Sequence, residues 1–338
     1  MTQWTATAVA HPNIALAKYW GKRDDGFNQP AVPSLSVTLA GMATKTTVTF
    51  DASFEHDTFS LAGQPVSGGP LVRVVGLLDR VRRTSGRTER AHVESVNDFP
   101  TAAGLASSAS GFAALALAAA AAAGIDSDAT YVSDLARRTS VSAARSAFGG
   151  FVELPAGNPG DDDLSAIPIA PPDHLDLRVI VAVTREGPKD VSSTEGMKHT
   201  VRTSPYYPAW VASAPEVCRR VREAILHRDM ESLGIAAEES ALAMHASSIA
   251  ARPGLIYWTG ATVEVLHEIR RLRARGLVAY ATIDAGPHVK VLTTATDEAR
   301  VVEALSELPG VKRTIPALPG LGARVVDVHI PMSRGSKS

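Results

Sequence analysis

The chain has a single cysteine, Cys218, among its 338 residues. One cysteine excludes internal disulfides and is typical of a protein that folds in a reducing cytoplasm. Acidic and basic side chains nearly cancel, leaving a net charge of -1, so the basic excess that attracts nucleic acid or an anionic membrane is missing. Positive charge that serves binding must therefore be concentrated locally, at a small anionic ligand.

Long apolar runs are missing too. The alanine-rich stretch within residues 111–125 is shorter than a membrane span and only weakly apolar, so we expect a tightly packed interior helix. The N-terminal residues have neither the basic region nor the apolar core of a secretion signal, which favours a cytoplasmic location. The ten histidines show no HExxH or paired-ligand spacing, so we expect no structural zinc site. The acidic run at residues 161–163 is interpreted as a solvated loop.

Strand and helix patterns are mixed along the chain without regular alternation. Strands are predicted at residues 5–10, 36–39, 44–50, 91–96, 177–183, 279–283, 289–293 and 325–329, with a short one inside GGFVELPAG. Helices are predicted at residues 71–83, 128–138, 210–226, 229–244 and 262–275, besides the alanine-rich one. A doubly wound sheet needs regular alternation, so the predicted class is α+β with two halves.

The segment NDFPTAAGLASSASG combines a small-residue loop with the start of a helix. Pro100 stiffens its entry and Gly104 allows the backbone to approach a ligand. The helix start is crowded by Ser107, Ser108 and Ser110. Free backbone N–H groups and the positive end of the helix dipole favour an anion there, although small-residue turns before helices are common. No GxxxxGK[ST] signature occurs, which excludes the Walker type of phosphate loop.

The segment NIALAKYWGKRDD places Lys18, Lys22 and Arg23 around an aromatic pair, Tyr19 and Trp20. Three cations close in sequence can bind a multiply charged anion. A solvated strand end or turn is the alternative interpretation.

In TSVSAARS, Ser140, Ser142 and Arg145 are close enough in sequence to surround one phosphate with hydroxyls and a forked cation. Either serine could instead be an ordinary helix cap.

The segment GPKDVSSTEGM places Lys189, Ser192, Ser193 and Thr194 before a helix predicted to begin near Glu195. Hydroxyl groups at a helix start can cap the helix or bind an anion, and both interpretations stay open.

In ATIDAGPHV, Asp284 ends an apolar strand and enters a Gly-Pro turn. A carboxylate at this position can reach a cleft as a base, or it can simply form the turn. Taken together, the segments supply a nucleotide loop, an anion pocket and a candidate base, which phosphoryl transfer to a hydroxyl requires.

These segments resemble the diphosphomevalonate decarboxylase family. NIALAKYWGKRD, PSLSVTL, NDFPTAAGLASSASG, SAARSAFGGFVEL, DVSSTEGM and DAGPHVKVL occur in the family's order and spacing over nearly the whole chain. The serine-rich loop alone is similar to the broader superfamily of galactokinase, homoserine kinase and mevalonate kinase. KYWGKRD and DAGP are far narrower signals.

The resemblance implies ATP-dependent decarboxylation of 5-diphosphomevalonate to isopentenyl diphosphate, ADP, phosphate and carbon dioxide, with Mg²⁺. It also implies a two-domain α+β fold with the active site in the cleft between the halves. We place a nucleotide-binding domain at residues 1–175 and a C-terminal α+β domain at residues 176–338. A homodimer that binds its small-molecule substrate and ATP is expected, without nucleic-acid or membrane partners.

The resemblance also implies roles for individual residues. Asp284 matches the catalytic aspartate, and Lys18 matches the lysine that keeps it ionised. The implied substrate-binding residues are Tyr19, Lys22, Arg73, Ser140, Ser142, Arg145, Ser193 and Thr194. The implied nucleotide-binding residues are Ser95, Asn97, Ala106, Ser107 and Ser108, with Ser107 and Ser108 also nearest to magnesium.

Three positions depart from the family pattern. Val141 stands where glycine is typical, Ala144 where cysteine is frequent, and His288 where asparagine is usual. These changes leave the reaction class intact but keep other outcomes open, namely a decarboxylase of 5-phosphomevalonate or a kinase that stops after phosphorylation. Retained Lys18 and Asp284 argue against a simple 3-kinase, and together with the serine loop they argue against a catalytically silent binding protein.

Overall fold

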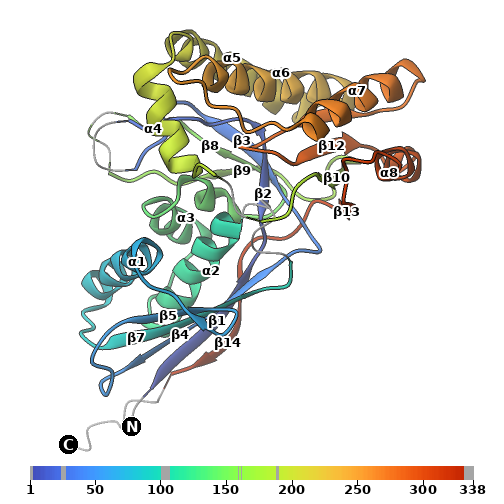
Figure 1. Cartoon of the computed structure of the whole chain (residues 1–338). Helices are drawn as coiled ribbons and strands as arrows, with labels where there is room; N and C mark the ends of the chain where they lie inside the picture. The colour runs from blue at the N-terminus through green and yellow to red at the C-terminus, as the bar shows by residue number, and fades with distance from the viewer. Residues whose placement is uncertain are drawn as a thin grey trace, which may run out of the picture.

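The computed structural model describes residues 3–23, 28–99, 107–158, 160, 162–187 and 190–330. Three sheets and their helices are arranged so that one sheet lies at one end of the molecule and a helical layer at the other (Figure 1). The arrangement confirms the predicted α+β class. Among the described residues, no helix is both long enough and apolar enough to span a bilayer.

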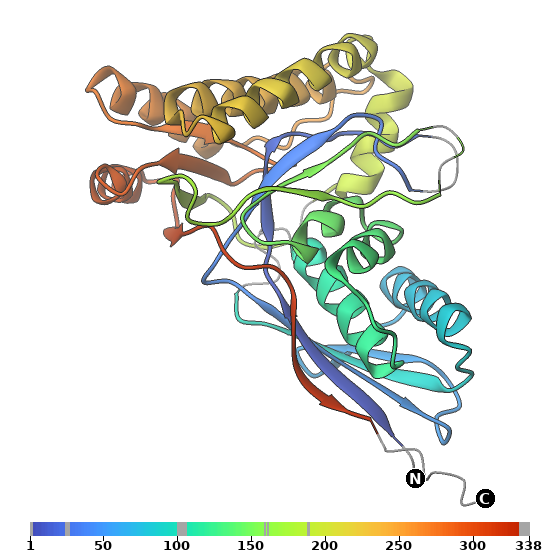
Figure 2. The same ribbon diagram turned by 180° about the vertical axis from the view of Figure 1, so that it is seen from behind.

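The largest sheet has six strands in the order β14-β1-β4-β7-β5-β6. Its strands are β1 (Trp4–Ala10), β4 (Thr44–Asp51), β5 (Thr58–Leu61), β6 (Gln64–Pro65), β7 (Arg90–Asn97) and β14 (Arg324–His329). Alternate residues of β4 are buried, as its polar and apolar alternation predicts. Strand β14 pairs antiparallel with β1, so the last strand of the chain joins the sheet that the first strand begins (Figure 2).

Three helices accompany this sheet: α1 (Gly69–Ser85), α2 (Ser107–Ala122) and α3 (Ala129–Arg137). Helix α2 is the alanine-rich segment, and most of its residues are buried against strands on one side and helices on the other. Alanine side chains allow that close approach because they carry no atoms beyond Cβ. The predicted interior helix is therefore confirmed.

Two four-stranded sheets form the rest of the molecule. One has the order β2-β3-β8-β9, with β2 (Asn13–Ala17), β3 (Ser34–Thr38), β8 (Phe151–Leu154) and β9 (Ile167–Ala170). The other has the order β11-β12-β10-β13, with β10 (Arg178–Val183), β11 (Tyr280–Thr282), β12 (Val289–Thr293) and β13 (Arg313–Ala317). The remaining helical segments are the 3-10 helix η1 (Val141–Ala147), α4 (Ser193–Thr203), α5 (Tyr207–Leu226), α6 (Met230–Ile249), α7 (Gly260–Ala274) and α8 (Glu298–Ser306).

The position of strand β10 between two cores explains why its sequence is almost continuously apolar. Val179, Val181 and Val183 point into the core that β2, β3, α5 and α6 share, whereas Ile180 and Ala182 point into a second core formed with α7 and α8. Both faces of the strand are therefore buried, and no polar alternation is possible.

The other predicted strands and helices are present, with differences at their ends. The predicted strand at residues 36–39 runs over Ser34–Thr38, and α5 begins at Tyr207 rather than Trp210 because Pro208 is tolerated in the first turn of a helix. Strands β2, β5, β6, β9 and β13, the 3-10 helix η1 and helix α8 were not predicted, and all of them are short. Most residues of β5, β6, β9 and β13 are only partly buried or exposed, which leaves a weak hydrophobic pattern, whereas β2 is fully buried.

Candidate active site

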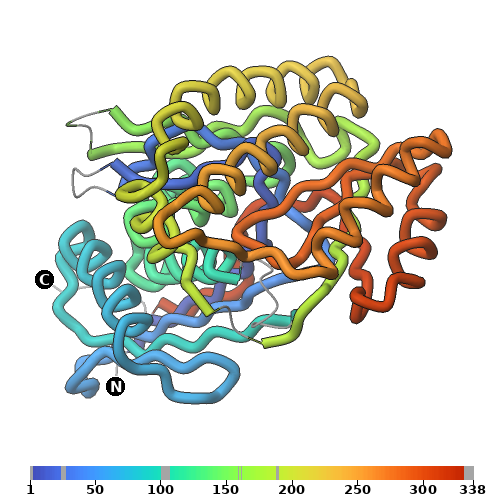
Figure 3. Tube along the Cα trace, turned by 45° about the horizontal axis from the view of Figure 1, so that its top comes forward, coloured from blue at the N-terminus to red at the C-terminus, as the bar shows by residue number. Residues whose placement is uncertain are grey.

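A cavity of about 570 Å³, here called the central cavity, lies where the segments around β2, η1, α2, α4 and β11 meet. These segments are far apart in the sequence but meet in the middle of the molecule (Figure 3). Twelve of the predicted site residues line it: Lys18, Tyr19, Lys22, Arg73, Ser107, Ser108, Ser140, Ser142, Arg145, Ser193, Thr194 and Asp284. Ser95 and Asn97 line a neighbouring cavity, and Ala106 lies outside the described residues, as does Lys189.

Asp284 follows β11, and its carboxylate lies between two lysine side chains. Lys18 Nζ is 2.7 Å from Oδ1, and Lys290 Nζ is 3.1 Å from Oδ2. Both lysines are buried, whereas 27% of the Asp284 side chain is exposed. Lys290 was not predicted, although a lone lysine inside the apolar stretch VKVLT, six residues after Asp284, is a signal that could have revealed it.

Hydrogen bonds from three segments hold the backbone near Lys18 and Asp284 in place. Lys18 Nζ also donates to the carbonyl of Ala15 at 2.8 Å, and Thr282 Oγ1 donates to the same carbonyl at 3.1 Å. These bonds tie β11 to β2 and hold the aspartate beside the lysine. His245 on α6 has its Nε2 at 2.8 Å from the carbonyl of Asp284, so Nε2 carries the proton and donates. His245 was not predicted, and nothing in its sequence surroundings singles it out.

The two ammonium groups determine the charge of this cluster. Burial raises the pKa of Asp284, but Lys18 and Lys290 outweigh burial and hold that pKa well below its usual range. Burial lowers the pKa of Lys18 to about 8, with Asp284 opposing that shift and Lys290 adding to it. Burial also lowers the pKa of His245 to about 4, so this ring is neutral at pH 7. Near neutrality the cluster therefore holds one carboxylate and two cations.

Arg145 on η1 is a buried cation whose hydrogen bonds go to neutral groups. Its Nη1 donates to Ser34 Oγ at 2.6 Å, its Nε to Ser36 Oγ at 2.9 Å, and its Nη2 lies 3.3 Å from Asn13 Oδ1. Burial lowers its pKa to about 10, so it remains charged at pH 7. Within the described part of the chain, no carboxylate forms an ion pair with Arg145, which indicates a site for an anion that arrives from outside.

Ser140 and Ser142 stand at the start of η1 beside Arg145. Ser140 occupies the cap position but makes no side-chain capping bond, and its Oγ is 3.4 Å from Ser142 Oγ. The helix-cap interpretation is therefore not supported for Ser140. Both hydroxyls instead line the central cavity.

The hydroxyl groups at the start of α4 have two different roles. Ser192 caps the helix in a capping box with Glu195, so the helix begins at Ser193 rather than near Glu195. Ser193 and Thr194 lie in the first turn, where both line the central cavity. The capping interpretation therefore holds for Ser192.

The rim of the central cavity carries further positive charge. Burial lowers the pKa of Lys22, and the nearby cations Arg73 and Lys198 lower it further. Arg73 extends from α1, with its guanidinium 4.4 Å from the centre of the Phe112 ring. Burial also raises the pKa of Tyr19, so its phenol stays protonated and can donate a hydrogen bond. An anion in this cavity would meet cations from three segments.

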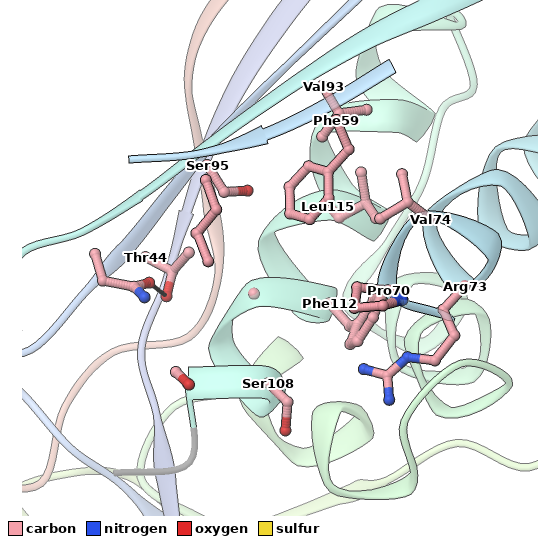
Figure 4. Close-up of a pocket in the computed structure, with 14 residues that line it drawn as sticks. Thr44, Phe59, Pro70, Arg73, Val74, Val93, Ser95, Ser108, Phe112 and Leu115 are labelled. Carbon is pink, nitrogen blue, oxygen red and sulfur yellow. Dashed lines mark hydrogen bonds between the residues drawn. The ribbon is translucent and has the colours of Figure 1, made fainter. Parts of the chain in front are cut away.

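A second cavity, here called the apolar cavity, has a volume of about 160 Å³ and adjoins the first. One part is lined by the apolar side chains of Phe59, Val74, Val93 and Leu115, while Ser108 and Arg73 lie at the opposite end (Figure 4). Arg73, Ser107 and Ser108 line both cavities and so mark the passage between them. A ligand with a flat apolar part and an anionic tail would fit this arrangement.

The polar residues near the apolar cavity are engaged with one another. Ser95 Oγ is 2.7 Å from Thr46 Oγ1, and Thr44 Oγ1 donates to Asn97 Oδ1 at 2.6 Å. Ser110 Oγ is 2.7 Å from Thr44 Oγ1 and fully buried, so Ser110 anchors α2 to β4.

No cluster of three or more His, Cys, Asp or Glu side chains suited to a metal ion occurs among the described residues. Asp162 and Asp163 form ion pairs with Arg138. A hydroxyl-lined passage with sparse protein ligands fits Mg²⁺ bound mainly through phosphate oxygens and water, because magnesium keeps several of its waters.

The three departures from the family pattern occupy buried positions. Val141 packs with Val152 and Leu154 while also lining the central cavity. The carbonyl of Ala144 accepts a hydrogen bond from Ser133 Oγ at 2.9 Å. His288 Nδ1 accepts from the Thr184 N–H at 3.2 Å, which ties the loop after Asp284 to the end of β10.

Known proteins are similar to this chain in sequence and in structure. Residues 10–166 match the family described as diphosphomevalonate decarboxylase-like N-terminal domain, and residues 179–319 match the mevalonate 5-diphosphate decarboxylase C-terminal domain. The diphosphomevalonate decarboxylase of Candida albicans is 34% identical over 318 residues, covering 89% of this chain and 88% of that protein. The phosphomevalonate decarboxylase of Haloferax volcanii is also 34% identical, over 303 residues, covering 89% of this chain and 92% of that protein.

A solved structure described as MDDEF in complex with MVAPP, AMPPCP and magnesium is similar with a TM-score of 0.90 and 40% identity, covering 96% of this chain and 99% of that one. The fold is thus that of the galactokinase, homoserine kinase and mevalonate kinase superfamily. Within it, the chain belongs to the diphosphomevalonate decarboxylase family, whose members are ATP-dependent decarboxylases.

Proposed function

We propose that this protein converts (R)-5-diphosphomevalonate and ATP into isopentenyl diphosphate, ADP, phosphate and carbon dioxide, a step of the mevalonate pathway of isoprenoid synthesis. The observation that carries the proposal is the Asp284 carboxylate, held by Lys18 at 2.7 Å in a cavity whose serine-lined passage leads to an apolar cavity. The site thereby combines a candidate base, a pocket for the substrate's anionic groups and an adjoining apolar cavity for the nucleotide. The complex of the related structure with MVAPP, AMPPCP and magnesium supports the same combination.

In this mechanism Asp284 accepts the proton of the substrate's 3-hydroxyl as the hydroxyl oxygen bonds to the terminal phosphorus of ATP. A carboxylate with a lowered pKa is a weak base, but a loose phosphoryl-transfer transition state releases the hydroxyl proton late, when it has become acidic. The C–C bond to the carboxylate then breaks, its electrons form the double bond, and the 3-phosphate leaves with its own electron pair. Bound Mg²⁺ near Ser107 and Ser108 would neutralise phosphate charge.

The remaining cavity residues bind and orient the substrate. Arg145, Ser140 and Ser142 form one anion site, and Tyr19, Lys22 and Arg73 supply further donors, with Ser193 and Thr194 facing them from α4. Binding energy from the unreactive diphosphate positions the 3-hydroxyl against Asp284.

Several cations at the central cavity favour a diphosphate over a monophosphate, because each added phosphate charge needs a partner. The Haloferax volcanii relative, named a phosphomevalonate decarboxylase, keeps the monophosphate as the second candidate.

The test offers ATP and magnesium with mevalonate, its 5-phosphate and its 5-diphosphate in parallel, and measures ADP and carbon dioxide separately. We expect both products, in equal amounts, from the diphosphate. Turnover of the monophosphate alone would replace the proposed substrate, and ADP without carbon dioxide would identify a kinase. No ADP from any of the three would indicate a silent binding protein.

We propose that residues 1–175 form the nucleotide-binding domain and residues 176–338 the second domain. The apolar cavity, lined only by residues between 44 and 115, supports the first assignment, and the two family matches divide between residues 166 and 179. Strand β14 does not follow this division, because it lies within residues 176–338 but pairs with β1 of the nucleotide-binding domain.

We further propose a cytoplasmic homodimer, which the family resemblance and the single, buried Cys218 support. Val325, Val326 and Val328 expose apolar surface on the edge strand β14, a kind of surface that a second chain can cover. Sedimentation at micromolar concentration should show a species of twice the 35.5 kDa chain mass. A species of single chain mass only would contradict the dimer.

A further inference from the structure

Lys290 lies on β12, where its neighbours Val289, Val291 and Leu292 are fully buried apolar residues. Its side chain is 1% exposed, and its Nζ is 3.1 Å from Asp284 Oδ2. Unlike Lys18, Lys290 does not line the central cavity. It therefore contacts the carboxylate from behind, away from the space that a substrate would occupy.

The two oxygens of Asp284 have different surroundings. Oδ2 is buried, whereas the side chain as a whole is 27% exposed, so the carboxylate reaches the cavity through Oδ1. Rotation about the bond to a carboxylate is only weakly restricted in itself. A cation on each oxygen removes that freedom and fixes which oxygen faces the cavity.

Fold stability does not explain a lysine at this position. A buried ion pair gains little over apolar side chains of similar volume, because both charges must leave water. The rest of β12 is buried and, apart from Thr293, apolar, so a methionine would suit the strand. The lysine charge instead lies in contact with the carboxylate of the candidate base, Asp284.

We propose that Lys290 is a positioning residue that holds Oδ2 of Asp284 and so keeps Oδ1 directed at the substrate hydroxyl. This inference rests on the proposed function. Lys290 touches no substrate in this arrangement and acts only through Asp284.

The charged and titratable groups that face Asp284 come from four segments. Lys18 follows β2, Lys290 is on β12, Arg145 is on η1, and neutral His245 is on α6. Because Lys290 lowers the pKa values of both Asp284 and Lys18, its removal should raise both. In the pH profile of kcat/KM, the alkaline limb near pH 8, where Lys18 loses its proton, should then move to higher pH.

The experiment compares wild type with Lys290→Met and Lys290→Arg. A displaced catalytic group costs about a hundredfold in rate, so we expect Lys290→Met to lower kcat by roughly ten- to a hundredfold with KM changed by less than about threefold. Lys290→Arg keeps the charge and should leave the alkaline limb at its wild-type pH while recovering part of kcat. Val291→Ala, a packing defect in the same strand, is the matched control and should lower Tm without moving the alkaline limb.

A second readout does not require turnover. NMR of ¹³C-labelled lysine, with the Lys18 signal assigned from Lys18→Met, should show a higher titration midpoint for Lys18 in Lys290→Met than in wild type. If wild type turns over none of the phosphorylated mevalonates, the proposed function fails while this shift still tests the coupling. An unmoved alkaline limb and an unmoved Lys18 midpoint in Lys290→Met would overturn the role of Lys290, whatever its effect on Tm.

Discussion

Replacing Asp284 by Asn is expected to lower kcat by about a hundredfold to ten-thousandfold, the range typical of a lost acid–base group. The amide has nearly the same shape but cannot take the proton from the 3-hydroxyl, and it loses its ionic contacts with Lys18 and Lys290. ADP and carbon dioxide should fall together, because phosphorylation precedes loss of the carboxylate. Near-wild-type turnover would rule out Asp284 as the base.

Loss of the carboxylate also leaves two buried lysines without their anion, which lowers stability. The fold should nevertheless persist, because Lys18 can release its proton at a pKa of about 8 or below. Binding of an ATP analogue should survive, since Asp284 does not line the apolar cavity. Asp176→Asn is a matched control, because this exposed aspartate pairs with Arg178 away from the cavity and its loss should leave kcat unchanged.

Replacing Arg145 by Ala is expected chiefly to weaken binding of the phosphorylated substrate. A charge-assisted contact to a desolvated anion contributes about 2 kcal/mol or more, which corresponds to a rise in KM of at least about 30-fold. The guanidinium is already held by Ser34, Ser36 and Asn13, so its position is set before the substrate arrives. Steady-state kinetics with varied substrate at saturating ATP measure the effect.

Two further variants separate charge from packing at this site. Arg145→Lys keeps a positive charge but not the planar fork, so its KM should lie between those of wild type and Arg145→Ala. Arg222→Ala removes an exposed arginine that pairs with Glu153 and should change neither constant. Unchanged KM and kcat in Arg145→Ala would remove Arg145 from the anion pocket.

Much of the candidate site could be predicted because its residues occur close together in a few short segments of the sequence. The spacing of Ser140, Ser142 and Arg145 placed two hydroxyls and a cation together, and the structure lines the central cavity with all three. Lys18 and Asp284 were also predicted as a pair, and they form an ion pair although they are 266 residues apart in the sequence. Here the family resemblance, rather than periodicity, supplied the pairing.

Other features could not be predicted because they depend on contacts between distant segments. The segment NIALAKYWGKRDD offered a solvated strand end or turn as one interpretation, yet β2 at its start is fully buried, since α5, α6 and the sheet that contains β10 share its core. The hydrogen bond from His245 to the carbonyl of Asp284 joins positions 39 residues apart, and no local pattern encodes it. Strand β14 was predicted as a strand, but its pairing with β1, the first strand of the chain, was not predicted, because it joins the two ends of the sequence.

The reaction class and a set of candidate site residues could be inferred from the order of residues alone, because spacing along a chain constrains local chemistry and a family's motifs keep their order. Three features required the folded chain: which oxygen of Asp284 contacts which lysine, the burial of Arg145 without an ionic partner among the described residues, and the serine-lined passage between the two cavities. Those features are relations between side chains brought together by burial. Burial depends on how whole sheets and helices pack, which no single segment specifies.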